Sequence, residues 1–324
     1  MKKKPIKKKI WNIAIAIAFL FAAQGCVKDN LGDCGLNIRI QYTKNKAGVD
    51  HLANGVNHLT LYVFDSNRTF VGAYPSQGAL YNGYTIPLLL KSGTYDFVVW
   101  GNLDGDEYDI PSLVPGQSQA STLNLKFKKV TSDNRVVEFP DSLYYGAALR
   151  MNVRPSLQEN QDCVIDLKKN TKKITVKASG LTGPESEGKE FNCNIVSRNA
   201  GLRFLDDGIF DNTLVTYVPR DSMNEQEQLR ISEFVVLREI ADNTTESKLI
   251  YTMTENGQVR TLPLPEESLV AILKAFFLNR GWNIDERWDI EDEFVIELAF
   301  NLNTHANATI TINGWEYDAI GADV

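Results

Sequence analysis

The stretch KLIYTMTENGQVRTLPL, residues 248–264, has the sequence pattern of a β-hairpin. Residues with high strand propensity lie on both sides of Asn256-Gly257, and Asn-Gly is the pair most typical of a two-residue turn between antiparallel strands. We therefore predict two paired strands that reverse direction at this dipeptide. If the rest of the chain repeats units of this kind, the protein belongs to the mainly β class.

Short runs of the same kind recur along most of the sequence. They are LNIRIQYT (36–43), HLTLYVFD (58–65), SGTYDFVVWGN (92–102), TLNLKFKKV (122–130), KKITVKASG (172–180), FNCNIVSRN (191–199), TLVTYVP (213–219), SEFVVLREI (232–240), EFVIELAFNL (293–302) and ATITINGW (308–315). Short strands separated by turn residues at roughly 8–12-residue spacing are typical of β-sandwiches. The sequence therefore predicts a mainly β protein built from sandwiches.

One segment has a helical pattern instead. Pro265-Glu266-Glu267 precedes SLVAILKAFFLNRG, in which acids lie at the start and Arg280 and Gly281 at the end, as expected for helix termini. Its apolar residues fall on one face, namely Leu269, Ile272, Leu273, Phe276 and Phe277. We predict one short helix that packs against a sheet in the second half of the chain.

The N-terminus has the features of an export signal. Residues 2–9 contain six lysines and no acid, and residues 10–23 carry no charge. This apolar run of 14 residues is shorter than the about 20 that a spanning helix needs. Because small residues precede Cys26, we predict a lipoprotein signal peptide over 1–25, lipid attachment at Cys26 and a lipid-attached linker over 26–33. The alternative is an ordinary signal peptide or membrane anchor that happens to end near a cysteine.

The remaining length suggests two domains. About 300 residues follow the signal, which corresponds to roughly two domains of common size. Residues 150–162 are polar and contain a proline, so we place the linker there and predict an N-terminal domain over 34–158 and a C-terminal domain over 159–324. We interpret the lysine-rich stretch KKNTKK (168–173) as a solvated turn or strand edge.

The charge of the mature chain excludes some partners. The full sequence has 34 basic and 41 acidic residues. Loss of the six signal-peptide lysines leaves 28 basic residues against 41 acidic ones, a net charge of −13. Nucleic acid requires a basic face, and so does attraction to anionic lipid. We therefore expect no nucleic-acid partner, and we expect the lipid rather than a basic patch to hold the protein at the membrane.

The sequence carries no recognisable catalytic or metal-binding motif. G-x-S-x-G, G-x-x-x-x-G-K-[ST], G-x-G-x-x-G and C-x-x-C are all missing from it. The acidic segment NLDGDEYD (102–109) is not an EF-hand, because position 12 of such a loop would be Leu113. We interpret the acids between Asp285 and Glu293 as a surface loop. We expect no enzyme activity, no cofactor and no metal.

The cysteines leave the disulfide question open. If Cys26 is lipidated, Cys34, Cys163 and Cys193 remain, and three thiols can form at most one internal bridge. The sequence does not decide which pair, if any, is bonded.

An ordered set of motifs gives the chain a resemblance to one family. These are CVKDNLGDC (26–34), LTLYVFDSNRTFVG (59–72), SGTYDFVVWGN (92–102), DSLYYGA (141–147), KKNTKKITVKASGL (168–181), LPLPEESLVAILKA (262–275), DEFVIELAF (292–300) and ITINGW (310–315). With them, the chain resembles the fimbrial anchor lipoproteins of Bacteroidales, the FimB-type minor fimbrial subunits. It departs from the family at NIDERWDIEDEF (283–294), where only the outline of the usual stretch is kept.

The resemblance implies both a fold and a role. The fold would be two tandem transthyretin-like Greek-key β-sandwiches with one short helix in the second. The role would be that of a non-enzymatic lipoprotein of the outer membrane, facing outward at the base of a fimbria. There it would limit or terminate filament growth through strand-mediated contact with a pilin. The polar, acidic end EYDAIGADV would make a poor donor strand, which favours a base over a stalk role.

Two other roles stay open from the sequence. One is a lipidated tip adhesin. The other is a surface glycan-binding lipoprotein, which would need exposed aromatic platforms, with Trp100, Trp282, Trp288 and Trp315 as candidates.

Overall fold

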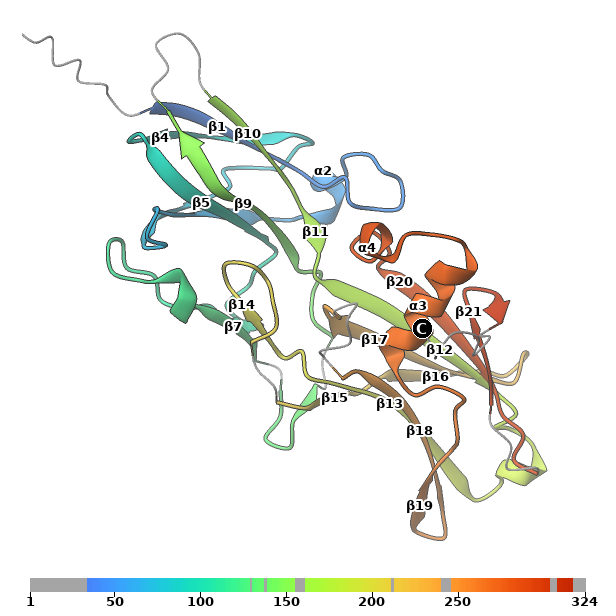
Figure 1. Cartoon of the computed structure of the whole chain (residues 1–324). Helices are drawn as coiled ribbons and strands as arrows, with labels where there is room; N and C mark the ends of the chain where they lie inside the picture. The colour runs from blue at the N-terminus through green and yellow to red at the C-terminus, as the bar shows by residue number, and fades with distance from the viewer. Residues whose placement is uncertain are drawn as a thin grey trace, which may run out of the picture.

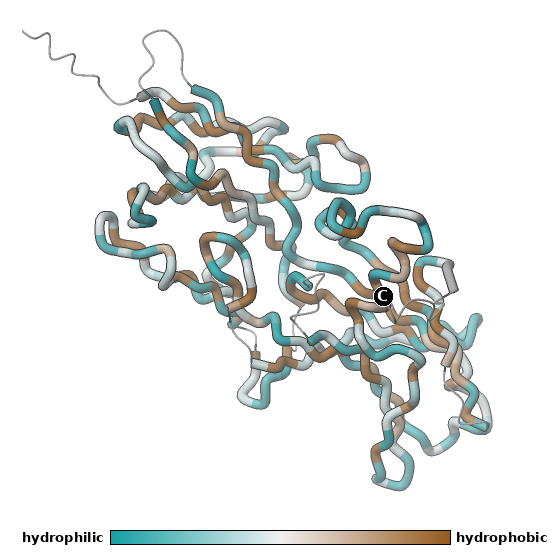
Figure 2. Tube along the Cα trace, viewed as in Figure 1, coloured by the Kyte–Doolittle hydropathy of each residue, from teal (hydrophilic) through white to brown (hydrophobic). Residues whose placement is uncertain are grey.

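The computed structural model describes residues 34–128, 130–136, 139–154, 161–210, 213–239, 246–303 and 308–316. Strands dominate this part of the chain and form five sheets (Figure 1). Brown and teal residues alternate along many of them, which is the apolar and polar alternation of strands that are buried on one face (Figure 2). The predicted mainly β fold with sandwiches is confirmed.

The N-terminal sandwich consists of two facing sheets. One has the strand order β10 (Gln161–Asp166), β1 (Cys34–Gln41) and β4 (Tyr84–Leu90). The other has the order β11 (Lys168–Lys169), β9 (Tyr144–Val153), β5 (Gly93–Gly101), β2 (Leu59–Phe64) and β3 (Phe70–Pro75). Ile38 and Ile40 of β1 belong to one buried cluster with Phe97 and Val99 of β5. This cluster is the core of the sandwich.

The C-terminal sandwich has two larger sheets. One has the order β16 (Arg220–Asn224), β17 (Leu229–Leu237), β12 (Thr171–Ser179), β20 (Glu293–Ala299), β21 (Thr309–Ile312) and β22 (Trp315–Glu316). The other has the order β19 (Gln258–Thr261), β18 (Lys248–Glu255), β13 (Lys189–Ser197), β15 (Val215–Tyr217) and β8 (Arg135–Val136). Ile174 and Val176 of β12 lie beside Phe294 and Ile296 of the parallel strand β20, and all four are buried.

The predicted hairpin is present in this second sheet. Glu255 pairs with Gln258 on either side of the turn, and β18 and β19 run antiparallel from there. Asn256 and Gly257 have φ values of 52° and 76°, the left-handed conformation that this turn needs and that Asn and Gly tolerate best.

A small third sheet joins the two sandwiches. Its order is β14 (Gly201–Arg203), β7 (Asn124–Phe127) and β6 (Tyr108–Asp109). It helps to cover the face of the β9–β5–β2 sheet that points away from the N-terminal core. There the Phe204 ring lies 4.8 Å from that of Tyr62 and 5.9 Å from that of Trp100. These residues belong to the same buried cluster as the C-terminal core, so the two sandwiches share apolar packing.

Strand pairing carries the N-terminal sandwich past the expected domain border. β10 pairs in parallel with β1 from Leu36 opposite Gln161 to Gln41 opposite Asp166, and β11 pairs with β9. By pairing alone, this sandwich ends at Lys169 instead of residue 158. In the other direction, β8 lies before the expected border and pairs with β15 of the C-terminal sandwich.

The predicted helix is α3 (Leu269–Asn279). It begins where the Ser268 hydroxyl accepts a hydrogen bond of 3.2 Å from the Ala271 amide, an N-cap of common type. All five residues of the predicted apolar stripe are buried. The other helices are one turn each, namely α2 (Leu52–Gly55), α4 (Ile284–Arg287) and the 3₁₀ turns η1 (Ala120–Thr122) and η2 (Pro184–Ser186). None of the helices in the described ranges could span a membrane.

We predict that the buried face of α3 stabilises the C-terminal sandwich. Leu273→Ala should lower the free energy of unfolding by about 2–5 kcal/mol, because it removes a fully buried side chain and leaves a cavity. Leu278→Ala on the same helix is the matched control, since Leu278 is 61% exposed and its loss should cost within about 0.5 kcal/mol. Equal losses in chemical denaturation would contradict this packing.

Candidate functional site

The structure gives no view of the predicted lipid site, because Cys26 lies outside the described residues. Cys163 and Cys193 both carry free thiols, so these two do not bridge to each other. Burial raises the pKa of both thiols, which makes them poor nucleophiles. No cluster of His, Cys, Asp or Glu in the described ranges is arranged to hold a metal ion.

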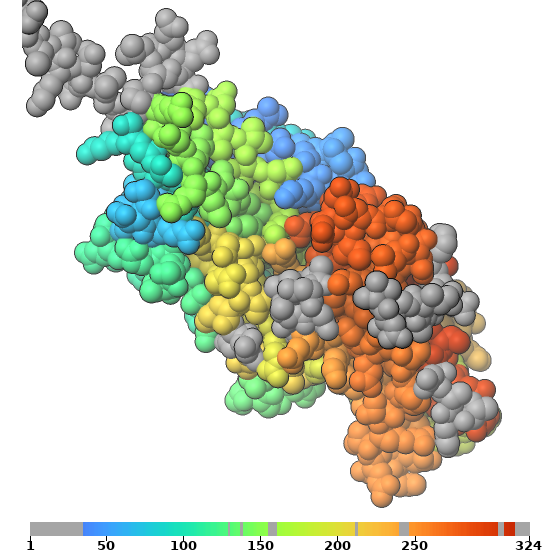
Figure 3. Space-filling model, in the orientation of Figure 1, coloured from blue at the N-terminus to red at the C-terminus, as the bar shows by residue number. Residues whose placement is uncertain are grey.

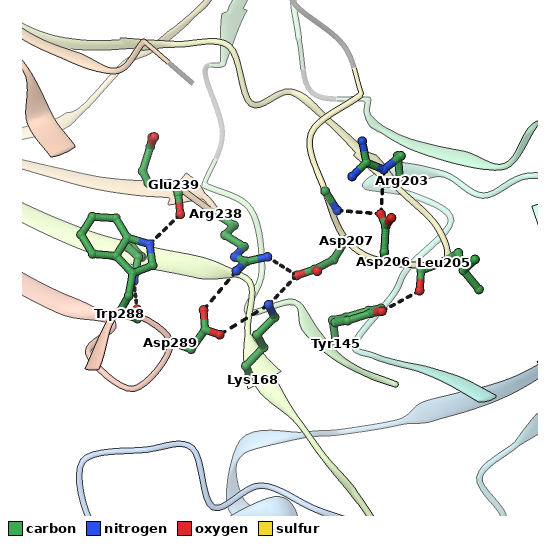
Figure 4. A network of polar contacts seen from close by, with 12 residues as sticks. Tyr145, Lys168, Arg203, Leu205, Asp206, Asp207, Arg238, Glu239, Trp288 and Asp289 are labelled. Carbon is green, nitrogen blue, oxygen red and sulfur yellow. Dashed lines mark hydrogen bonds and ion pairs between the residues drawn. The ribbon is translucent and has the colours of Figure 1, made fainter. Parts of the chain in front are cut away.

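The most elaborate polar site is the joint between the two sandwiches. The chain crosses it within residues 168–173, where β11 ends the N-terminal sheet and β12 begins the C-terminal one. Three further segments converge on this crossing, namely the turn after β14, the end of β17 and the loop between α4 and β20 (Figure 4). Long-range contacts therefore fix a point that the chain alone would leave free to bend.

Two cations and two carboxylates form the centre of this site. The carboxylate of Asp207 lies 3.1 Å from Lys168 Nζ and 2.7 Å from Arg238 Nη1. Asp289 lies 3.5 Å from Lys168 Nζ and 3.3 Å from Arg238 Nη2. Each charge thus has two partners of opposite sign, and Asp207 is almost fully buried. We call these four residues the joint cluster (Figure 4).

The cations of the joint hold Asp289 in its charged form. Burial by itself would raise the pKa of this carboxyl group. The positive charges of Lys168, Arg238 and Lys172 outweigh that effect, so its pKa lies below the ordinary value.

Lys172 is buried beside the joint cluster. Its ammonium group donates to the carbonyl oxygens of Trp288 at 2.7 Å and Glu291 at 2.8 Å. It also lies 5.1 Å from the centre of the Trp288 ring, which adds a cation–π contact. Desolvation lowers the pKa of Lys172 to about 8, although Asp289 and Asp292 favour the charged form.

Further bonds fasten the α4–β20 loop to both sandwiches. Trp288 Nε1 donates to the Glu239 carbonyl oxygen at 2.8 Å, which ties the loop to the end of β17. Lys169 Nζ lies 3.0 Å from Asp292, and Lys46 Nζ of the N-terminal sandwich lies 3.6 Å from Glu291. The loop therefore closes over the crossing strand.

Below the charges, two aromatic side chains bond across the joint. Tyr145 of β9 donates its hydroxyl hydrogen to the Leu205 carbonyl oxygen at 2.6 Å, and Trp100 of β5 donates from Nε1 to the Phe204 carbonyl oxygen at 3.0 Å. Both carbonyls belong to the turn after β14 that also carries Asp207. These directional bonds fix the position of that turn against the N-terminal sandwich.

Two expectations from the sequence hold only in part. KKNTKK does contain a strand edge, since Lys168–Lys169 form the edge strand β11, but it is not a solvated turn, because Lys168 is mostly buried and Lys172 is 4% exposed. Of the acids after α4, Glu293 is exposed as expected, but Asp289, Glu291 and Asp292 pair with lysines and do not form a free surface loop. The lysines of residues 168–173 and the acids after α4 are two blocks of opposite charge, and they were the only sign of this site in the sequence. A sequence does not show that two such distant blocks come into contact.

We predict that Asp207 supports the whole joint. Asp207→Asn should lower the free energy of unfolding by about 3–5 kcal/mol, because it leaves Lys168 and Arg238 with one carboxylate between them in a desolvated site. Asp206→Asn is the matched control. Asp206 pairs with Arg203 at the surface, where such pairs contribute about 0–1 kcal/mol. Similar thermal or chemical denaturation curves for the two variants would contradict this account.

We also predict a pH signature of Lys172. Between about pH 8 and 10.5, the unfolded chain binds a proton at this residue and the folded protein does not, so the free energy of unfolding rises with pH in this window. Relative to Lys172→Met, the wild type should gain about 1–3 kcal/mol from pH 7 to 10.5.

Lys173→Met is the control for this measurement, because Lys173 is half-exposed and pairs with Glu233 at the surface. Parallel pH profiles of thermal stability for the wild type and Lys172→Met would show that Lys172 does not titrate in this way.

Comparison with known proteins adds a family and a fold. The family model described as fimbrillin-A associated anchor proteins Mfa1 and Mfa2 matches residues 31–320. No curated protein matches the sequence.

Several solved structures share the fold over nearly their whole length. A Bacteroides thetaiotaomicron protein described as a candidate polysaccharide-binding protein has 22% identity and a TM-score of 0.72, and the match covers 88% of this chain and 98% of that one. The fimbrial anchor protein Mfa2 from Porphyromonas gingivalis has 21% identity and a TM-score of 0.66, with the same coverage. A candidate adhesin from Bacteroides ovatus has 17% identity and a TM-score of 0.71, with 89% and 96% covered.

Proposed function

Since the chain belongs to the family of fimbrillin-A associated anchor proteins Mfa1 and Mfa2, we propose that it is a non-enzymatic lipoprotein that anchors a fimbria at its base. The observation that carries this proposal is the family match itself, which spans residues 31–320 and hence both sandwiches. The family places the protein at the cell surface, together with fimbrial subunits. We further propose that the protein is held in the outer membrane and that the lipid is attached to Cys26.

The position of β1 fits a short tether. β1 begins at Cys34, eight residues after the proposed lipid site. A fully extended chain of this length spans about 25–30 Å. The lipid would therefore hold the β1 end of the N-terminal sandwich close to the membrane surface. The hairpin of β18 and β19 would then point away from it, since it lies at the opposite end of the molecule (Figure 1).

The joint between the sandwiches is suited to resist a pulling force. A filament attached to the C-terminal sandwich would pull against a lipid attached to the N-terminal one, so part of the force would pass through residues 168–173. The joint cluster and the shared apolar core would resist bending at that point. A flexible link would serve an anchor less well.

Contact with the pilin through strand addition is also part of the proposal. An added strand satisfies the free backbone groups of a sheet edge and needs no catalytic group. A subunit that accepts a strand but offers none of its own would end the filament.

The glycan-binding alternative finds little support. Trp100 and Trp288 are 1% and 3% exposed, so neither is a platform for a sugar ring. Trp282 is partly buried, and Arg280 and Arg287 stack on its ring. The side chain of Trp315 lies outside the described residues.

We predict that Cys26→Ala releases fimbriae from the cell. In the native host, palmitate labelling of the protein should disappear, and fimbriae should move from the cell fraction to the medium, because the acyl chains provide the attachment. Cys34→Ala is the matched control and should keep both the label and the attachment. Cell-bound fimbriae in the Cys26→Ala strain would contradict the anchor role.

A further inference from the structure

The short edge strand β19 differs from the longer sheet edges of the described chain, namely β3, β4, β10 and β16. It ends the five-stranded sheet of the C-terminal sandwich, and its hairpin projects as the orange lobe at the lower end of the molecule (Figure 3). Sheet edges with unpaired backbone groups attract further strands, and proteins usually protect them. The question is whether β19 is protected.

The backbone pattern shows which groups of β19 point outward. Opposite residues of an antiparallel pair alternate between hydrogen-bonded and non-bonded pairs. The Leu262 amide donates to the Tyr251 carbonyl oxygen at 2.8 Å, which identifies the bonded pairs. Val259 and Thr261 then lie in non-bonded pairs with Thr254 and Thr252. The amide and carbonyl groups of Val259 and Thr261 therefore face away from β18, and no described segment pairs with them.

The longer edges carry protection. Pro87 removes a donor from the free side of β4. The first residue of β3 bonds to the segment 116–118, since Phe70 donates to Ser118 O and accepts from Gly116 N, both at 2.8 Å. β10 carries two aspartates, and its Gln161 side chain bonds to β9 at Asn152 O. β16 has the charged sequence RDSMN.

β19 has none of these protective features on its free side. Its Val259 is 69% exposed, which leaves a β-branched apolar side chain on an open edge. The one charged residue of β19, Arg260, turns toward the hairpin and lies 3.7 Å from Met253 Sδ. In the part of the chain that the structure describes, no carboxylate pairs with this guanidinium group.

A pocket lies directly beside this edge. It has a volume of about 380 Å³ and is lined by Arg260, Thr261, Leu262, Pro263, Phe300, Asn301 and Leu302. Leu262 and Phe300 are mostly buried, and the Phe300 ring packs 5.0 Å from that of Tyr251. The pocket is thus an opening between the two sheets, with an apolar floor and a cationic side chain at its wall.

We propose that β19 and this pocket accept an extended segment of a fimbrial subunit by strand addition. The segment would bond to the outward groups of Val259 and Thr261 and place an apolar side chain over Leu262 and Phe300. An acidic residue of the segment, next to that apolar side chain, would pair with the guanidinium group of Arg260. The segment and the site would then carry complementary charges. This inference rests on the proposed anchor function and assigns the pilin contact to the end that points away from β1.

Proline at position 259 tests the edge directly. Val259→Pro removes an outward donor that β18 does not use, and its ring blocks a neighbouring strand. Val259→Thr is the matched control, because it keeps the donor and the β-branched shape. Tagged full-length protein is purified from the outer membrane of the native host, and the pilin that accompanies it is quantified by mass spectrometry.

We expect Val259→Pro to lower pilin recovery by at least about tenfold, because the added strand loses hydrogen bonds and cannot approach. Val259→Thr should stay within about twofold of the wild type. Arg260→Glu should reduce recovery more than Arg260→Gln, because it repels the acidic residue of the segment. The melting temperature of Val259→Pro should equal that of the wild type.

Other outcomes would overturn the assignment in distinguishable ways. Full pilin recovery with Val259→Pro would place the contact elsewhere and leave the anchor role intact. A lowered melting temperature would show that the edge is covered by the chain itself, and a change in oligomeric state would show that it pairs with a second copy. Recovery of no pilin even with the wild type would refute the anchor role and not only the site.

Discussion

The meeting of a lysine-rich crossing strand with an acidic loop is the contact on which the arrangement of the two sandwiches depends. Burial of charge is costly, and it is tolerated only where partners are close and well oriented. Lys168 and Arg238 each reach both Asp207 and Asp289, so a small rotation of one sandwich against the other would break several contacts at once. Apolar packing alone would tolerate such a rotation more easily, because it has no preferred direction.

The charges and the shared core therefore have different roles. The core around Trp100, Tyr62 and Phe204 contributes buried apolar area and holds the sandwiches together. The joint cluster selects one orientation among those that the core would allow. Tyr145 contacts both the shared core and the joint cluster. Its hydroxyl group donates to the Leu205 carbonyl oxygen, and the ammonium group of Lys168 lies 5.7 Å from the centre of its ring.

Sequence patterns predicted the parts of the fold whose signal is local. The Asn256-Gly257 turn and the stripe of α3 follow from backbone preference and periodicity, and both are found as predicted. β4 was missed, because Pro87 argues against a strand. The pairing of β4 and β10 with β1 was not predictable from the sequence, since β10 reaches β1 from more than a hundred residues away. The joint cluster was missed for the same reason, since Lys168 and Asp289 become partners only after both sandwiches have formed.

The contrast between protected and open edges bears on how the proposed anchor could be exported and still assemble with its partner. An exported chain with several open edges would pair with itself or with other proteins before it reached its partner. Here proline, charge, backbone bonds or side-chain bonds protect the edges β3, β4, β10 and β16, and the acidic composition adds repulsion between copies. A short open edge such as β19 is compatible with solubility, because four residues offer few hydrogen bonds to an unspecific strand. Stable pairing there would need the additional contacts of the neighbouring pocket, and this requirement for both edge and pocket would make the contact selective.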